Sequence, residues 1–389
     1  MRFLLRARWR LALGAAFIST VLLVYCGRAP QPVQFFASGR PEHLSDWSVL
    51  LREGGRRHGQ LLPNERVLPY ELNTPLFSDY AHKFRTLWMP PGTTARYSAT
   101  GTFEFPVGTI ISKTFYYPRA GNALNEVART YDQGRDFSSG GGLDLSQVRL
   151  IETRLLVRRE HGWEALPYVW NAQQTDAELA RTGDQMALEL VGADGEREAF
   201  TYVVPNENQC AGCHVTDLKS KAIAPIGPKA RHLNRDYPYA GGAQNQLTHL
   251  AKIGYLTGLP QLAAVPRNAD WRDASEPLDA RARAYLDVNC GHCHNPKGPA
   301  DTTALTFDVE TPPDRHLGVC KPPVAAGRGT GDHFYDIVPG HPDDSILPFR
   351  MASREPGVMM PEQGRGTVHR EGLALIRDWI AALPGECGA

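Results

Sequence analysis

The stretch "VRLIETRLLVRREHGWEALPYVW", residues 148–170, decides how the middle of the chain folds. Two runs rich in strand-forming residues flank His161-Gly162, so the stretch predicts two antiparallel strands joined by a tight turn. The stretch "MALELVGADGEREAFTYVVP", residues 186–205, repeats this form around Asp194-Gly195, a dipeptide that favours a type I′ turn. Both stretches therefore predict β-hairpins.

Strand patterns continue on the N-terminal side of this region. "TFEFPVGTIISKTFYYP", residues 102–118, contains two extended runs around a Pro106-Val107-Gly108 turn. We therefore expect an antiparallel sheet from about Leu68 to Val204. Before it, "PEHLSDWSVLL", residues 41–51, has the pattern of a short helix.

After Val204 the pattern changes to helices and ordered loops. Apolar residues at helical spacing predict one helix within residues 240–256 and another within residues 367–383. A third predicted helix, residues 276–289, leads directly into a pair of cysteines. The later part of the chain is therefore expected to be helical.

The composition bounds the classes of function. A chain of 389 residues is long enough for two or three domains, and its 42 Lys and Arg balance its 42 Asp and Glu. Because it lacks an overall basic field, we expect no nucleic-acid partner. Docking to a protein partner would depend on a local patch.

Residues 1–29 have the pattern of an export signal. Arginines at positions 2, 6, 8 and 10 precede an apolar run from Leu11 to Tyr25, which is short for a membrane span. Cys26 ends a "LLVYC" stretch that partly resembles a bacterial lipoprotein box, although Tyr25 stands where such boxes have a small residue. We expect export, with three outcomes open: lipidation of Cys26, plain cleavage, or an uncleaved anchor that attaches the chain to the membrane.

Two five-residue motifs carry the chemistry. They are Cys210-Ala211-Gly212-Cys213-His214 and Cys290-Gly291-His292-Cys293-His294. The first four residues of the second motif match the redox tetrapeptide of protein disulfide isomerases, but the charged helical pattern before it lacks the apolar strand of a thioredoxin framework. All five residues match the attachment signature of c-type haem.

The haem interpretation accounts for the histidine that the isomerase interpretation leaves unexplained. Two thiols three positions apart can bond the vinyl groups of one haem, and the histidine after the second thiol can bind its iron. We therefore predict covalent haem at both motifs, with iron ligation by His214 and His294. The alternative is a structural zinc held by the four thiols, although zinc sites usually place their ligand pairs closer together along the chain.

The second haem has a candidate sixth ligand downstream. Met359 and Met360 lie in a Pro- and Gly-bounded loop before the last predicted helix, where small c-type cytochromes place a thioether ligand. Met360, which precedes Pro361, is the first choice, and Met359 is the second. The alternative is that both methionines fill gaps in a core.

The first haem has no such local ligand, because no methionine lies between Met186 and Met351. The nearby candidates are the imidazoles of His232 and His249. Weaker candidates from the upstream sheet region are Lys113, His82 and Met186. An open or water-bound sixth position is the alternative, and open coordination is typical of haem that binds small molecules.

Two further expectations concern the surroundings of the motifs. A ligating histidine usually donates its second ring N–H to a carbonyl. The loops Pro225–Lys229, after His214, and Gly298-Pro299, after His294, could supply that carbonyl or be ordinary turns. Cys320 and Cys387 remain as a candidate disulfide in an oxidising compartment, against the alternative of two unpaired thiols.

The chain also resembles a known family. The segments that carry the resemblance are "YELNTPLFSDYAHKFRTLWMPPG", "FPVGTIISKTFYYP", "ETRLLVRREHGWEALPYVWN", "NQCAGCH", "PIGPKARHLN", "NCGHCHNPKGPA" and "DDSILPFRMASREPGVMMPEQGR". Together they are similar to the bacterial dihaem c-type cytochrome family of Gram-negative bacteria, over about Leu68 to Cys387.

The resemblance implies haem at Cys210, Cys213 and His214 and at Cys290, Cys293 and His294. It also implies a parallel β-helix protein, encoded nearby, as a candidate partner. Separately, Lys113 within "GTIISKTF" makes the chain weakly similar to cytochromes whose haem is cross-linked to a lysine and oxidises hydroxylamine.

Together these observations predict an α+β multidomain protein, in which an antiparallel β-rich domain precedes one or more helical cytochrome c-like haem domains. The predicted parts are a signal at 1–29, a β-rich domain at 30–205, a first haem-binding segment at 206–273 and a cytochrome c domain at 274–389.

The predicted function is electron transfer through two haems to a redox partner protein, in the periplasm or on a membrane that faces it. One alternative is an oxidoreductase that acts on a small molecule at an open first haem, with the second haem as relay. Another is a surface-binding module whose sheet recognises a β protein or a polysaccharide. No catalytic residue is predicted from spacing alone.

Overall fold

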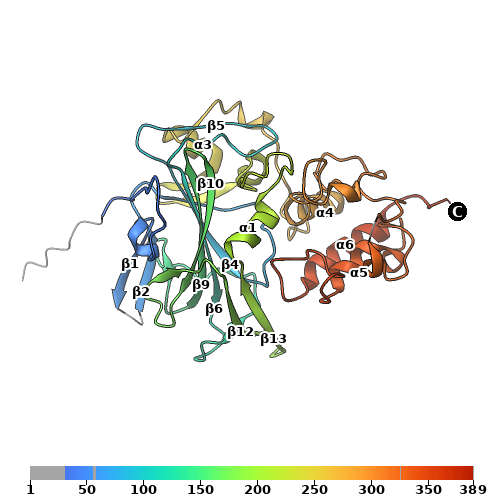
Figure 1. Ribbon diagram of the computed structural model, residues 1–389, viewed down its shortest axis with the longest axis horizontal. Helices are drawn as coiled ribbons and strands as arrows, with labels where there is room; N and C mark the ends of the chain where they lie inside the picture. The colour runs from blue at the N-terminus through green and yellow to red at the C-terminus, as the bar shows by residue number, and fades with distance from the viewer. Residues whose placement is uncertain (1–30, 56–57, 325, 389) are drawn as a thin grey trace, which may run out of the picture. The chain divides into compact units, whose positions relative to one another are not determined.

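An antiparallel sheet of six strands forms the centre of the computed structural model, which describes residues 31–55, 58–324 and 326–388. The predicted signal and Cys26 lie outside the described residues. In sheet order the strands are β11 (Ala177–Leu179), β10 (Gly162–Trp170), β9 (Val148–Arg159), β6 (Ile110–Pro118), β4 (His82–Trp88) and β3 (Leu68–Tyr70) (Figure 1).

The two predicted hairpins are confirmed. β9 pairs with β10 from Arg159↔Gly162 onwards, and Gly162 has a φ of +139°, which favours glycine. β12 (Asp184–Val191) pairs with β13 (Arg197–Val204), but their connection is longer than a type I′ turn. Asp194 has no positive φ, and Gly192 N donates to Glu196 O across a five-residue loop.

Two local predictions were wrong. Residues 41–51 form a single 3₁₀ turn, η1 (Leu44–Trp47), and then enter strand β1 (Leu50–Gly55). The first run of residues 102–118 makes only isolated bridges, Arg96↔Glu104 and Thr102↔Lys229, in place of a strand.

The two faces of the central sheet carry different cores, because successive side chains of a strand point to opposite faces. One face packs a continuous apolar cluster, which includes Trp47, Phe84 and Tyr168, against the small sheet of β1, β2 (His58–Pro63) and β8 (Leu143–Asp144). The opposite face carries two apolar clusters, one built around Phe115 and Tyr117 and the other around Leu87 and Ile111.

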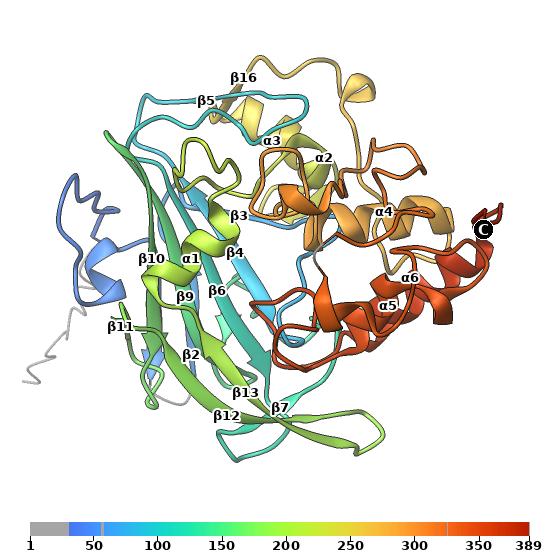
Figure 2. The same cartoon turned by 45° about the vertical axis from the view of Figure 1, so that its right-hand side comes forward.

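Smaller elements cover that opposite face. A three-stranded sheet joins β13 and β12 to β7 (Glu126–Ala128), and two two-stranded sheets join β14 (Asp236–Tyr239) to β15 (Gly242–Asn245) and β16 (Leu256–Thr257) to β5 (Ala95–Arg96). The helices here are α1 (Glu207–His214), α2 (Ala230–Leu233) and α3 (Gln246–Lys252), with the 3₁₀ turn η2 (Leu262–Ala264). Figure 2 shows α1 lying across the sheet on the side of the C-terminal helices.

The C-terminal region contains α4 (Leu278–Asn289), α5 (Ile346–Ala352) and α6 (Arg370–Ala382), with the 3₁₀ turns η3 (Asp301–Thr303), η4 (Gly327–Thr330) and η5 (Pro342–Asp344). Helices α4 and α6 pack through an apolar cluster that includes Tyr285, Ile376 and Trp379. The helices predicted at 276–289 and 367–383 are therefore confirmed as α4 and α6.

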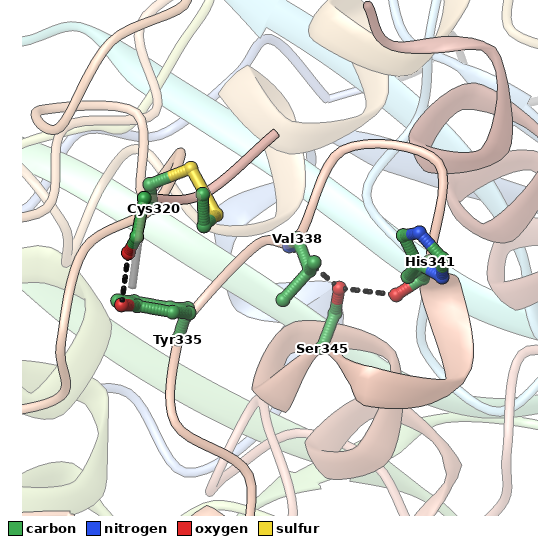
Figure 3. The surroundings of a disulfide bond; sticks show 7 residues. Cys320, Tyr335, Val338, His341 and Ser345 are labelled. Atoms are coloured by element: carbon green, nitrogen blue, oxygen red, sulfur yellow. Dashed lines mark hydrogen bonds between the residues drawn. A yellow bond between two sulfur atoms is a disulfide. The ribbon is translucent and has the colours of Figure 1, made fainter. Parts of the chain in front are cut away.

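The disulfide between Cys320 and Cys387 is confirmed, and it closes a loop across a sequence separation of 67. Figure 3 shows its surroundings. The Tyr335 hydroxyl donates to Gly388 O at 3.2 Å, and the buried Ser345 hydroxyl joins Val338 N (2.8 Å) to His341 O (2.9 Å). The loops and the C-terminal end of the chain are thus tied together.

Two residues of the N-terminal half bind the segment before α6. The buried Asp79 carboxylate accepts hydrogen bonds from Gly366 N (2.8 Å), Thr367 N (2.8 Å) and the Thr367 hydroxyl (2.8 Å). His369 stacks on Phe77, with ring centroids 4.1 Å apart. Residues separated by almost 290 positions therefore meet in one junction.

The prediction of helical cytochrome c-like haem domains was wrong. The described residues are β-rich, with 27% strand, 19% helix, six helices and five sheets, and no helical cytochrome c-like domain is evident among them. Pro and Gly recur throughout residues 291–342, and both oppose helix formation. Turns and 3₁₀ segments therefore occupy most of the chain between α4 and α5.

Contacts divide the chain into two units, Met1–Gln31 and Pro32–Ala389. The domain boundaries predicted at residues 206 and 274 stay predictions. Among the described residues, no helix is both long and apolar enough to span a lipid bilayer.

Candidate functional site

The first motif lies on helix α1. The helix begins after Asn206, whose side chain accepts from Gln209 N (2.8 Å), while the Gln209 side chain accepts from Asn206 N (2.9 Å). This reciprocal cap fixes the first turn of the helix. As a result Cys210 and Cys213 lie one turn apart, and His214 is the last helical residue.

The ring of His214 is held in one tautomer. Its Nδ1 lies 2.8 Å from Ala224 O, and a carbonyl can only accept, so Nδ1 carries the proton and Nε2 keeps a lone pair. Burial, and then the charge of Lys113, lowers the pKa of His214 to about 4. The carbonyl lies directly before the loop Pro225–Lys229, from which it was expected.

The second motif follows the end of helix α4 and is built from turns. Cys293 N and His294 N both donate to Cys290 O, at 3.1 and 2.9 Å. A Cβ on Gly298 would lie 2.3 Å from Cys293 O, so the chain can return this closely only with glycine at that position.

His294 is oriented by a hydroxyl and not by a carbonyl of Gly298-Pro299, which had the ordinary turn as its alternative. Its Nδ1 lies 3.1 Å from the Thr303 hydroxyl, which itself donates to Ala300 O at 2.7 Å. The hydroxyl proton is therefore engaged, and the oxygen accepts from Nδ1. Burial, followed by the charge of Arg350, lowers the pKa of His294 to about 4, which leaves a neutral ring with Nε2 available.

The two motifs touch one another. Cys293 Sγ lies 3.7 Å from Gly212 O, and Leu218 N donates to Lys297 O at 2.9 Å. A Cβ on Gly212 would approach the end of the Gln363 side chain to 2.8 Å. Segments 80 residues apart in sequence are therefore packed together, beside the loop that carries the two methionines.

The Met359-Met360 loop is anchored on α5. Met360 N donates to Arg350 O (3.0 Å), and Met360 O accepts from Arg365 Nη2 (2.8 Å). Both methionine side chains are partly buried. Arg350 also contributes to the pKa shift of His294, so this loop and the second motif share a neighbour.

Four of the five candidate sixth ligands for the first haem make their contacts elsewhere in the fold. His82 is hydrogen-bonded through both ring nitrogens, to Asp136 (2.6 Å) and Thr130 O (2.8 Å). His232 Nε2 lies 3.1 Å from Asp287, and His249 stacks on Tyr239. Met186 packs against the cluster of Phe115 and Tyr117.

Lys113 is the candidate that approaches the first motif. Its charge acts on both Cys213 and His214. Burial, followed by the charges of Arg154 and Arg85, lowers the pKa of Lys113 to about 7. Its ammonium lies 5.1 Å from the centroid of the Phe115 ring.

Lys113 belongs to a row of cations on the face of the sheet that carries α1. The register places Arg85, Lys113 and Arg154 directly opposite one another on β4, β6 and β9, an arrangement that is destabilising without counter-charges. Arg154 is paired with the buried Glu152, and Arg85 lies 3.6 Å from Glu71. Among the described residues, Lys113 has no hydrogen bond or ion pair.

Sequence reasoning missed this row. Lys83 and Arg85, and likewise Glu152 and Arg154, occur two residues apart within predicted strands, which puts each pair on one face. That local signal does not say which strands are neighbours. The row becomes visible only when β4, β6 and β9 are paired.

The donor set fits two c-type haems. All four motif cysteines are unpaired, and burial raises the pKa of Cys290 and of Cys293 to about 12, so both are thiols. Each motif also supplies a neutral imidazole that is hydrogen-bonded through Nδ1, and within the described residues neither Nε2 has a hydrogen bond that would compete with iron. No group of three or more His, Cys, Asp or Glu suited to a metal ion occurs in the described part of the chain.

Comparison of the chain with protein-family models, with curated proteins and with solved structures found no match.

Proposed function

We propose that the protein is an exported dihaem c-type cytochrome that carries electrons through two covalently bound haems. Cys210 and Cys213 would anchor the first haem, and Cys290 and Cys293 the second, and His214 and His294 would bind the two haem irons. The observation that carries the proposal is the 3.7 Å contact between Cys293 Sγ and Gly212 O. Electron transfer between two haems requires that they lie close together, and this contact brings the two attachment segments together.

The residues around each motif have defined roles in this proposal. Haem iron, when bound, supplies reversible one-electron chemistry. Ala224 O and the Thr303 hydroxyl hold the rings of His214 and His294 with Nε2 directed away from these partners. Fixing the tautomer and orientation of a ligand raises its basicity and keeps the site rigid.

Haem stoichiometry tests this proposal. The full chain is produced together with cytochrome maturation machinery, and covalent haem is measured by pyridine haemochrome absorbance against protein concentration. We expect about two haems per chain, since each Cys-x-x-Cys-His motif attaches one. The double variants Cys210→Ser/Cys213→Ser and Cys290→Ser/Cys293→Ser should each lose one haem, and a wild-type ratio of one or none would contradict the relay.

Met360 is the proposed sixth ligand of the second haem. Met360→Ala should abolish the charge-transfer band between thioether and iron in the oxidised spectrum, with two haems retained. Met359→Ala is the matched control, because it removes the neighbouring thioether from the same loop. Loss of the band in Met359→Ala alone would reassign the ligand, and an unchanged band in both variants would exclude the loop.

A second candidate function is oxidoreductase activity on a small molecule at an open first haem. The unpaired Lys113 beside His214 favours it, because a cation with a pKa of about 7 can donate or accept a proton there. The reduced protein with carbon monoxide separates the two functions. A spectral shift from one haem would favour the enzyme, and no shift would favour electron transfer alone.

Partners and location belong to the same proposal. Electrons would enter and leave through a redox partner protein in the periplasm, and a parallel β-helix protein encoded nearby is the candidate. Co-purification with that protein, retained or lost in the haem-deficient double variants, would show whether binding needs the haems. Binding that persists without haem would favour a surface-binding module.

A further inference from the structure

The face of the central sheet that carries α1 gathers positive charge around one aromatic ring. Lys83 Nζ, Lys113 Nζ and Arg154 Cζ lie 5.6, 5.1 and 4.3 Å from the centroid of the Phe115 ring. The register adds Arg85, which lies directly opposite Lys113. Because opposite residues of neighbouring strands have their Cβ atoms about 4.5–5.5 Å apart, the four cations form one compact group, the cation cluster.

Two members of the cation cluster have a carboxylate partner. Arg154 donates to the buried Glu152 at 2.5 and 2.7 Å. Arg85 Nη1 lies 3.6 Å from the Glu71 carboxylate. One negative charge therefore offsets each arginine.

The two lysines of the cluster have no such partner. Lys83 donates to Leu76 O (2.8 Å) and Ala81 O (3.0 Å), which carry no formal charge. Neither Lys83 nor Lys113 forms an ion pair within the part of the chain that the structure describes. Charges held away from water are costly unless they are paired, so the cluster lacks two negative charges.

The helix that carries the first motif lies on the same face as the cluster. The Tyr202 hydroxyl donates to Glu152 at 2.6 Å, and Tyr202 packs in the same apolar cluster as Phe115. Strand β13, which contains Tyr202, runs into α1 after two residues. Helix α1 packs against β10, and Figure 2 shows it crossing the sheet.

The outer members of the cluster are accessible to a ligand. Lys83 and Arg85 are buried, whereas Lys113 is only partly buried and the Arg154 side chain is 27% exposed. An apolar cluster borders the row of Arg85, Lys113 and Arg154 on each side. This surface suits a ligand that combines an apolar body with anionic groups.

We propose that the cation cluster binds a pair of carboxylates, and that these are the two propionates of the haem at the first motif, which Lys113 and Arg154 contact. The inference rests on the proposed dihaem function. Two propionates carry two negative charges, the number that the cluster lacks. Hydrogen bonds between a cation and a carboxylate are stronger than neutral ones, and charges and hydrogen bonds around a haem tune its reduction potential.

The test compares Lys113→Met with wild type as full chains that each carry two haems. Resonance Raman spectra of the reduced protein report the hydrogen bonding of the propionates through their bending mode, and spectroelectrochemical titration gives the potential of each haem. In Lys113→Met the bending mode of one haem should shift. The equilibrium of that haem should move about tenfold toward oxidised iron, which is about 59 mV for one electron, because a nearby cation favours the reduced state.

Three further variants assign the effect. Lys113→Arg keeps the charge and the donor, so it should retain both wild-type values. Lys252→Met removes the same charge from an exposed position on α3 and should change neither value. Lys113→Met in the chain with Cys290→Ser/Cys293→Ser, which lacks the second haem, should show the same shift and so place it at the first haem.

The outcomes separate this inference from the function on which it rests. A wild-type ratio below two haems contradicts the dihaem proposal itself. With two haems present, an unchanged propionate mode in Lys113→Met would overturn the inference, even if the potential falls, because the lysine would then act through its field alone.

Acetate distinguishes the two sources of a carboxylate. Titration of wild type with acetate at constant ionic strength should leave both haem potentials unchanged, because the propionates already fill the site. A potential that falls with acetate would show that the cation cluster takes a free carboxylate, and would overturn the assignment to the propionates.

Discussion

The sheet region and the C-terminal region hold the same five-residue motif by different means. In the first motif the cysteines lie on a capped helix beside a hydrogen-bonded sheet, whose register fixes the row of Arg85, Lys113 and Arg154. In the second motif they lie in turns, and a disulfide and a small apolar cluster hold the surrounding loops. A motif thus predicts chemistry, while its surroundings decide how rigidly that chemistry is held.

The largest expected effect on stability is that of removing the charge of Glu152. It tests whether this carboxylate offsets the repulsion within the row of cations. This carboxylate is fully buried, accepts from Arg154 at 2.5 and 2.7 Å, and also accepts from the Tyr202 hydroxyl at 2.6 Å. Glu152→Gln removes its charge and should lower the free energy of unfolding by about 3–5 kcal/mol. Urea denaturation measures this loss, and a loss below about 1 kcal/mol would show that the row needs no counter-charge.

The second effect tests whether the C-terminal region depends on its cross-link. Cys320→Ser/Cys387→Ser opens a loop of 67 residues, and the entropy of the unfolded chain then favours unfolding by about 4 kcal/mol at most. We expect a loss of about 2–4 kcal/mol in denaturation experiments. Wild type treated with a reductant should behave like the variant, whereas equal stability with and without the bond would remove the contrast between the regions.

The third effect tests the junction at His369, which bonds Tyr131 on one side (2.6 Å) and Tyr285 of α4 on the other (2.8 Å). Burial, then Lys83, lowers the pKa of His369 to about 3. Unfolding therefore takes up a proton between pH of about 6.5 and about 3, and stability falls as the pH falls, by about 1.4 kcal/mol per unit.

The measurement for the junction is denaturation at several pH values between 4 and 6. His369→Phe should be less stable than wild type at pH 7, but its stability should fall less steeply with decreasing pH, by the equivalent of about one proton. If stability falls equally steeply with pH in the two proteins, His369 is already protonated in the folded state over this pH range.

The smallest effect is expected at the exposed pair of Arg96 and Glu104, whose side chains are 70% and 61% exposed. Glu104→Gln removes the same charge as Glu152→Gln, and it should change the free energy of unfolding by less than about 1 kcal/mol because solvent screens the pair. It serves as the surface control for the buried carboxylate. A loss as large as that of Glu152→Gln would mean that burial does not explain the difference.

Much of the sheet could be predicted, because strand pattern and turn residues are local. The hairpin of β9 and β10 and the two helices α4 and α6 follow from spacing that can be read within twenty-five residues. The prediction of cytochrome c-like helical domains was wrong, because the cysteine motif is a covalent signature and says nothing about the fold around it. The Pro- and Gly-rich segment after His294 decides against helices there.

The candidate site divides in the same way. The thiols and the proposed iron-binding histidines were chosen by spacing, and the carbonyl that orients His214 was expected within one residue of its position. The contact of Cys293 with Gly212 and the cation row both depend on non-local pairing, which a pattern in one segment does not reveal.

The bonds from Asp79 to Gly366 and Thr367 also govern the timing of folding. They join residues 287 and 288 positions apart, so the loop that contains Asp79 lacks its partners until almost the whole chain is available. Contacts of such long sequence separation form late and slowly. During synthesis from the N-terminus, the Asp79 carboxylate therefore stays solvated until Gly366 and Thr367 have been made, and this junction can form only then.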